Sequence, residues 1–143
     1  MICSSGSIPI TNAKGLITTV ISQTQDGKVQ YGLEGAVECG AGTINWSRNS
    51  LSLFNNFKQL EEDVSDLSSN GGVFFVPCMS GLYSPYWDNN AKSILIGLSL
   101  NSEKKHILRA LLEGLAYRVK DCFLEMAKYC SSSDILITDG GVT

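Results

Sequence analysis

Two clusters of small residues have the composition of phosphate-binding turns. Each follows an apolar segment, and the first is followed by Asn45 within an amphipathic pattern. A glycine turn between a strand and a helix presents backbone N–H groups and the positive helix end to an anion. Because open α/β sheets bind ligands where strands end, we predict a nucleotide or phosphate site between the two turns. The alternative is that these turns only let a helix pack closely on a strand. The candidate residues are Gly40, Ala41, Gly42, Asn45, Gly140 and Gly141.

The other side chains that could take part in chemistry form no catalytic or metal-binding pattern. The five cysteines are widely spaced without a C-x-x-C pair, which indicates reduced core residues and neither a zinc site nor a disulfide framework. The single histidine, His106, stands where a helix is expected to start and is interpreted as a surface or capping residue. Asp88 precedes two asparagines, which is more typical of a turn than of a metal or substrate ligand. We therefore assign no catalytic residue and no metal ligand.

Composition and charge describe one globular domain. The chain has 143 residues, of which 43% are hydrophobic and 17% charged. Its net charge is −3 and no basic cluster is longer than Lys104–Lys105, which argues against nucleic acid as the main partner. No basic leader precedes an apolar stretch, and no apolar run approaches the roughly 18 residues that a membrane span needs. We expect a cytoplasmic protein without a membrane span.

Hydrophobic periodicity predicts an alternation of strands and helices. Gln25-Asp26-Gly27 separates two β-branched runs and predicts a hairpin, whereas spacings of 3 and 4 predict two amphipathic helices. The aromatic stretch 78–90 has no period and is interpreted as an ordered loop. The predicted strands are 1–3, 16–22, 28–38, 73–76, 93–100 and 134–138, and the predicted helices are 51–67 and 103–129. This order favours an α/β fold with a mixed β-sheet flanked by helices.

Three stretches resemble the FGGY carbohydrate kinases, and within that family the glycerol kinase branch. The first two are YGLEGAVECGAGTINWSRN and FFVPCMSGLYSPYWD. The third fills the family's second signature region, which asks for small, apolar, glycine, polar and acidic residues at fixed offsets. Its residues here are Ser93, Leu95, Gly97, Leu98, His106, Ile107, Ala110 and Glu113. The resemblance runs over the whole chain.

The resemblance implies an actin-like ATPase, or ribonuclease H-like, domain that binds ATP or ADP with Mg²⁺. Residues 1–143 then form a single, incomplete, C-terminal domain that supplies the nucleotide-binding half of a glycerol kinase. In the family the nucleotide contacts positions that fall on Ala41, Asn45, Gly140 and Gly141 here. Ala41 stands where the family usually has glycine, and Asn45 replaces a longer polar residue. The catalytic Asp and the polyol-binding residues belong to sequence upstream of Met1, so glycerol is expected as a partner only with the N-terminal domain.

Two alternatives stay open at this point. The chain could be a non-catalytic nucleotide-binding or regulatory module of the same fold, or part of a related kinase for another polyol or sugar. We also expect the isolated chain to aggregate or to form homo-oligomers unless it meets its other half, because an uncovered sheet edge or face invites self-association.

Overall fold

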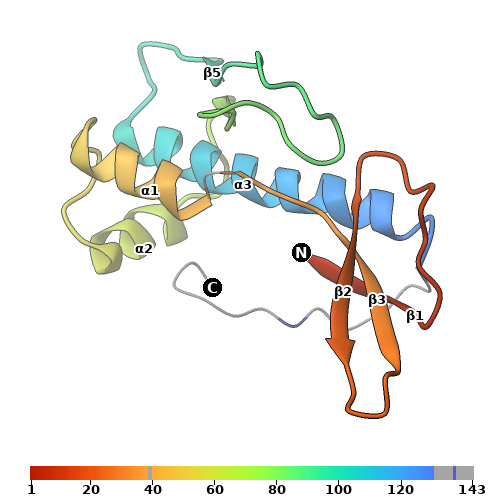
Figure 1. Ribbon diagram of the computed structural model, residues 1–143. Helices are drawn as coiled ribbons and strands as arrows, with labels where there is room; N and C mark the ends of the chain where they lie inside the picture. The colour runs from red at the N-terminus through yellow and green to blue at the C-terminus, as the bar shows by residue number, and fades with distance from the viewer. Residues whose placement is uncertain (39, 131–136, 138–143) are drawn as a thin grey trace.

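The computed structural model describes residues 1–38, 40–130 and 137 (Figure 1). Three strands, two helices, two further strands and a long helix follow one another along the chain. They are β1 (Ile2–Gly6), β2 (Ile17–Gln23), β3 (Val29–Glu34), α1 (Gly40–Asn49), α2 (Phe57–Ser65), β4 (Phe74–Val76), β5 (Ile94–Ile96) and α3 (Lys104–Met126). The α/β class predicted from the sequence is confirmed.

The first sheet is built around the predicted hairpin. β3 is its central strand and pairs antiparallel with β1 on one side and β2 on the other. The backbone N–H of Thr24 donates to the carbonyl of Lys28 at 2.9 Å and closes the turn. Gly27 has a φ of +83° there, a conformation that glycine adopts without strain.

Among the described residues, the second sheet, which we call sheet B, contains β4 and β5, paired antiparallel with Phe74 opposite Ile96 and Val76 opposite Ile94. The described strands form two antiparallel sheets. The predicted strand 134–138 lies, apart from Ile137, outside the described residues. The loop 78–90, which joins β4 to β5, reaches toward the first sheet, where the Ser84 N–H donates to the Ala36 carbonyl at 3.1 Å and the Ala36 N–H donates to the Ser84 hydroxyl at 3.0 Å.

The predicted helix 51–67 is shorter than expected. Helix α1 already occupies residues 40–49, and α2 begins only at Phe57, after Asn56 accepts a hydrogen bond from the Gln59 N–H through its side chain at 2.9 Å. An asparagine in this role satisfies one of the free N–H groups of the first turn and fixes the helix start. Leu53 and Phe54 lie before that cap, in an irregular segment that still packs into the core.

Helix α3 connects the two sheets and agrees with the predicted helix 103–129 apart from its last turn. Its N-terminal half packs against α1, α2 and β4, and its C-terminal half lies beside the first sheet (Figure 1). At its start the Nδ1 of His106 accepts a hydrogen bond from the Glu103 N–H at 3.0 Å, which confirms the capping role. The core comprises Ile44, Phe54, Leu60, Val73, Phe75, Leu108, Ala110, Leu111 and Leu115. Among the described residues, no helix is long and apolar enough to cross a membrane.

Candidate functional site

The candidate residues at positions 40–45 form the first turns of α1. Gly40 is the first helical residue, and Ala41, Gly42 and Asn45 are exposed. Residues three and four apart share a helix face, so these three residues lie on one side of α1. The opposite side carries the buried residues Thr43, Ile44 and Ser47. The structure therefore brings four of the six predicted residues together at one helix end.

The first turn of α1 has chemical features that favour an anion. Its first turn contains no acidic side chain, and a Cβ added at Gly40 would meet no atom within 4 Å. Gly40 and Gly42 carry no side chain and Ala41 carries only a methyl group, so these three residues add little bulk beside the first N–H groups of the helix. These groups and the aligned peptide dipoles place a partial positive charge there. Gly140 and Gly141, the second predicted turn, lie outside the described residues.

The core fixes the position of α1. The indole of Trp46 stacks on the ring of Phe75 in β4, with centroids 6.4 Å apart and planes 20° apart. Near the other end of α1, the guanidinium of Arg48 lies 5.4 Å from the ring centroid of Phe57 in α2. Both contacts join α1 to neighbours that also pack on α3, so the exposed helix end is held on a rigid base.

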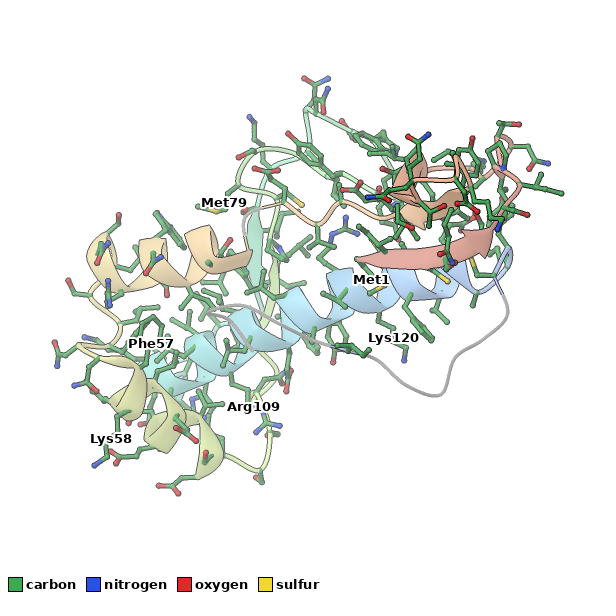
Figure 2. The ribbon with its side chains drawn as sticks, turned by 60° about the horizontal axis from the view of Figure 1, so that its bottom comes forward. Met1, Phe57, Lys58, Met79, Arg109 and Lys120 are labelled. Carbon is green, nitrogen blue, oxygen red and sulfur yellow. The ribbon has the colours of Figure 1, made fainter. Side chains whose placement is uncertain are left out.

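The signature region has a structural role in the described chain. Glu113 accepts a hydrogen bond from the Arg109 Nε at 2.8 Å and another from the Asn70 side chain at 2.9 Å. Arg109 also donates to the carbonyl of Leu67 at 2.8 Å, and Figure 2 shows its side chain projecting from α3 toward the segment after α2. These bonds fasten the turn before β4 to α3.

A second polar cluster, centred on Arg118, was not predicted. Arg118 is only 6% exposed and donates to the carbonyl of Ser84 at 2.7 Å and to Asp121 at 3.1 Å. Its guanidinium lies 5.2 Å from the ring centroid of Tyr86, whose hydroxyl donates to the same Asp121. The cluster ties the ordered loop 78–90 to α3. The signal was available, because Arg118 occupies the apolar stripe between Leu115 and Cys122.

The described cysteines and Asp88 agree with their predicted roles. Cys78, Cys122 and Cys130 are buried and free, and burial raises the pKa of all three thiols. For Cys130 the pKa rises to about 11, with a hydrogen bond to Cys3 as a further cause. Asp88 accepts the Asn90 N–H at 2.9 Å, as a turn former does. The part of the chain that the structure describes contains no group of three residues able to hold a metal ion.

The family model for the C-terminal domain of the FGGY family of carbohydrate kinases matches residues 1–143. The chain belongs to this family. Similar relatives include the glycerol kinase of Staphylococcus haemolyticus, 39% identical over 128 residues, which cover 90% of this chain and 26% of the relative. The glycerol kinase of Shewanella oneidensis is 38% identical over 143 residues, which cover 100% of this chain and 27% of the relative.

Solved structures of the family agree with this assignment. The glycerol kinase of Plasmodium falciparum with ADP matches with a TM-score of 0.81 and 29% identity, over 90% of this chain and 25% of that one. A xylulose kinase from Brucella ovis matches with a TM-score of 0.74 and 19% identity, over 90% of this chain and 25% of that one, and shows the shared fold. The actin-like fold of these sugar kinases is therefore confirmed. The chain spans about a quarter of the length of the FGGY kinases that it matches.

Proposed function

We propose that this chain forms the nucleotide-binding part of an ATP-dependent glycerol kinase. The carrying observation is the N-terminus of α1, whose first turn contains no acidic residue and whose residues Ala41, Gly42 and Asn45 share one exposed face. The backbone N–H groups of this turn would contact phosphate oxygens of ATP or ADP. Gly140 and Gly141 are proposed as the second turn of the same site. The likeness to an ADP-bound glycerol kinase supports this assignment.

Magnesium is proposed to enter with the nucleotide. Mg²⁺ in kinase sites keeps several waters and is held by one or two carboxylates together with substrate phosphates. The described residues offer no ready-made cluster of three ligating side chains, which fits an ion held mainly through the phosphates. When bound, it would neutralise charge that develops during phosphoryl transfer.

Glycerol is the proposed phosphoryl acceptor in the complete kinase. The two relatives with identities of 38% and 39% are both glycerol kinases, whereas the xylulose kinase is 19% identical. This difference favours glycerol over another polyol or sugar. The proposed location is the cytoplasm, which is consistent with free cysteines, since a reducing compartment keeps thiols unpaired.

Calorimetric titration of the folded chain with Mg-ADP tests the proposal. We expect saturable binding that Ala41→Glu weakens at least tenfold. The new carboxylate would repel the phosphates, although acids in the first turn favour the helix itself. Asn49→Glu is the matched control, because it adds the same charge to an exposed position about 12 Å along the same helix.

Two results would refute the site. One is a folded wild-type chain, checked by circular dichroism, that shows no heat of ADP binding. The other is equal weakening by Ala41→Glu and Asn49→Glu, which would mean that net charge and not the helix end governs the affinity.

A further inference from the structure

The first strand and the end of α3 bring two free cysteines together. Cys3 lies in β1 and is half-buried, whereas Cys130 follows the last residue of α3 by one turn and is 9% exposed. The thiols of the two residues are hydrogen-bonded to each other. Because the two residues stand far apart in the sequence, the tertiary fold and not local chain geometry places them side by side.

The register of the first sheet places Cys3 on the side that faces α3. Cys3 is opposite Leu33 of β3, and opposite residues of an antiparallel pair share a face of the sheet. Leu33 is fully buried and stands two residues before Gly35, where a Cβ would lie 3.2 Å from the Cε of Met126 in α3. Side chains two residues apart on a strand point to the same side, so Cys3 faces the helix. Figure 2 shows β1 passing over the C-terminal half of α3.

The helical spacing places Cys130 on the same side of α3 as Met126. The backbone N–H of Cys130 donates to the Met126 carbonyl at 3.0 Å, so Cys130 lies one turn further along. One helical turn advances by about 5.4 Å, and two residues of a strand advance by about 6.8 Å. The step from Met126 to Cys130 is therefore similar in length to the step from Gly35 to Leu33, beside which Cys3 lies. The contact between the two thiols thus follows from the backbone arrangement.

The surroundings hold the two thiols in place and leave one of them within reach of a reagent. The hydroxyl of Tyr129 accepts a hydrogen bond from the Lys14 N–H at 3.1 Å, which attaches the end of α3 to the segment before β2. Cys130 lies after the last residue of α3, so the small backbone shift that an S–S bond of about 2.05 Å requires leaves the helix intact. Burial raises the pKa of the Cys130 thiol to about 11, whereas Cys3 is the more exposed of the two. A reagent from solution therefore meets Cys3 first.

We propose that Cys3 and Cys130 are a redox-sensitive pair that a small-molecule disulfide converts into an intrachain disulfide. The Cys3 thiolate attacks one sulfur of the small disulfide and forms a mixed disulfide, and the first small thiolate leaves with the electron pair of the broken S–S bond. Cys130 then loses its proton to solvent and attacks the Cys3 sulfur, which releases the second small thiolate. Two protein thiols are oxidised, one small disulfide is reduced, and the two protons end on the two small thiols.

The new bond would fasten β1 to the end of α3. In a reducing compartment a disulfide of this kind is transient and reports the redox state, in contrast to the permanent disulfides of secreted proteins. Because the bond closes a loop that contains most of the chain, it restricts the unfolded state strongly. We expect it to raise the urea midpoint of the chain by on the order of 1 M.

Tryptic mapping of the folded chain after incubation with oxidised glutathione tests the proposal. Each of the five cysteines lies in a different tryptic peptide, so every linkage gives its own pair of peptides. We expect peptides 1–14 and 129–143 to be joined and to separate when dithiothreitol is added. In urea the yield of this pair should fall at least tenfold relative to the linkage between Cys122 and Cys130, because loop closure in an unfolded chain favours the nearer partner.

Substitutions of single cysteines provide the controls. Cys3→Ser and Cys130→Ala should each abolish the linked peptides and the shift in urea midpoint. Cys78→Ser is the matched control, because it removes another buried thiol, and it should leave the yield of the linked peptides unchanged. Circular dichroism verifies that each variant folds.

Three results would overturn the proposal. The first is a folded wild-type chain that carries only glutathione adducts and yields no linked peptides 1–14 and 129–143. The second is an equal yield of that pair, relative to the linkage between Cys122 and Cys130, in the folded and the urea-unfolded chain. The third is a loss of the pair in Cys78→Ser as complete as in Cys3→Ser, which would mean that the linkage does not depend on the contact between Cys3 and Cys130.

Discussion

Gly97 offers a direct test of how the signature region holds the chain together. Its φ is +84°, and a Cβ added to it would lie 2.9 Å from the carbonyl carbon of Gly72 and closer still to the oxygen. Gly27 in the β2–β3 turn has nearly the same φ, +83°, but a Cβ there would meet no atom within 4 Å. The two glycines differ in available space and hardly at all in backbone conformation.

The comparison of these two glycines separates the cost of backbone strain from the cost of a steric clash. An alanine in this left-handed region costs about 1 kcal/mol, and we expect Gly27→Ala to lose that amount of unfolding free energy. Gly97→Ala bears the same strain and must also displace the backbone at Gly72, and overpacking of this kind costs about 1–3 kcal/mol more. Both substitutions lower the conformational entropy of the unfolded chain by the same amount, so this contribution cancels in the comparison. We therefore expect Gly97→Ala to be less stable than Gly27→Ala by about 1–3 kcal/mol.

Urea unfolding followed by far-UV circular dichroism measures both variants under identical conditions. The denaturant slope should stay at the wild-type value, so that the shift in midpoint reports stability alone. Equal free energies of unfolding for the two variants would refute the reasoning, since they would mean that the contact between Gly97 and Gly72 contributes nothing.

Two further predictions concern buried polar groups. Arg118→Met should cost about 3 kcal/mol in urea unfolding, because it removes charge-assisted hydrogen bonds and the contact with Tyr86. Asp121→Asn should lower the free energy of unfolding by less than about 1 kcal/mol, because the Asp121 side chain is 37% exposed. Equal losses for Arg118→Met and Asp121→Asn would contradict the central role of Arg118 in the cluster. Cys130 should react with iodoacetamide about 100-fold more slowly in the native chain than in urea at pH 8, because only the thiolate reacts and the native pKa is about 11. Because the native pKa is raised, the contribution of this thiol to the free energy of unfolding is complete below pH 9 and is lost between pH 9 and 11. Equal labelling rates for the native and the urea-unfolded chain at pH 8 would contradict both statements.

Local signals in the sequence predicted the elements that depend on local chemistry. The Asp26-Gly27 turn was confirmed because its glycine adopts a positive φ between two β-branched runs. The long helix was confirmed because its apolar residues keep helical spacing for more than six turns. The division into α1 and α2 was not predicted, since Leu53 and Phe54 keep a helix-like spacing although they are buried in an irregular segment before Asn56.

Features that depend on the tertiary fold were less accessible to prediction. The approach of the loop 78–90 to the end of β3 is one such feature, because the Ala36 N–H donates to the Ser84 hydroxyl across 48 positions of sequence. At the candidate site, the sequence predicted a small-residue turn before a helix, whereas Gly40, Ala41 and Gly42 are already the first residues of α1. The roles of Arg109 and Glu113 required the structure, because their partners Leu67 and Asn70 come from a distant turn.

Helix α3 also sets the angle between the two ends of the molecule. Its first half holds α1 and sheet B, and its second half holds the first sheet through groups such as Cys122 and Met126, which lie against Gly35. One residue inserted between these halves would advance the helix by about 1.5 Å and turn everything beyond it by about 100°. The length of α3 is therefore a fixed geometric quantity, whereas the β2–β3 turn, which faces solvent, can vary in length without changing how the two ends are oriented.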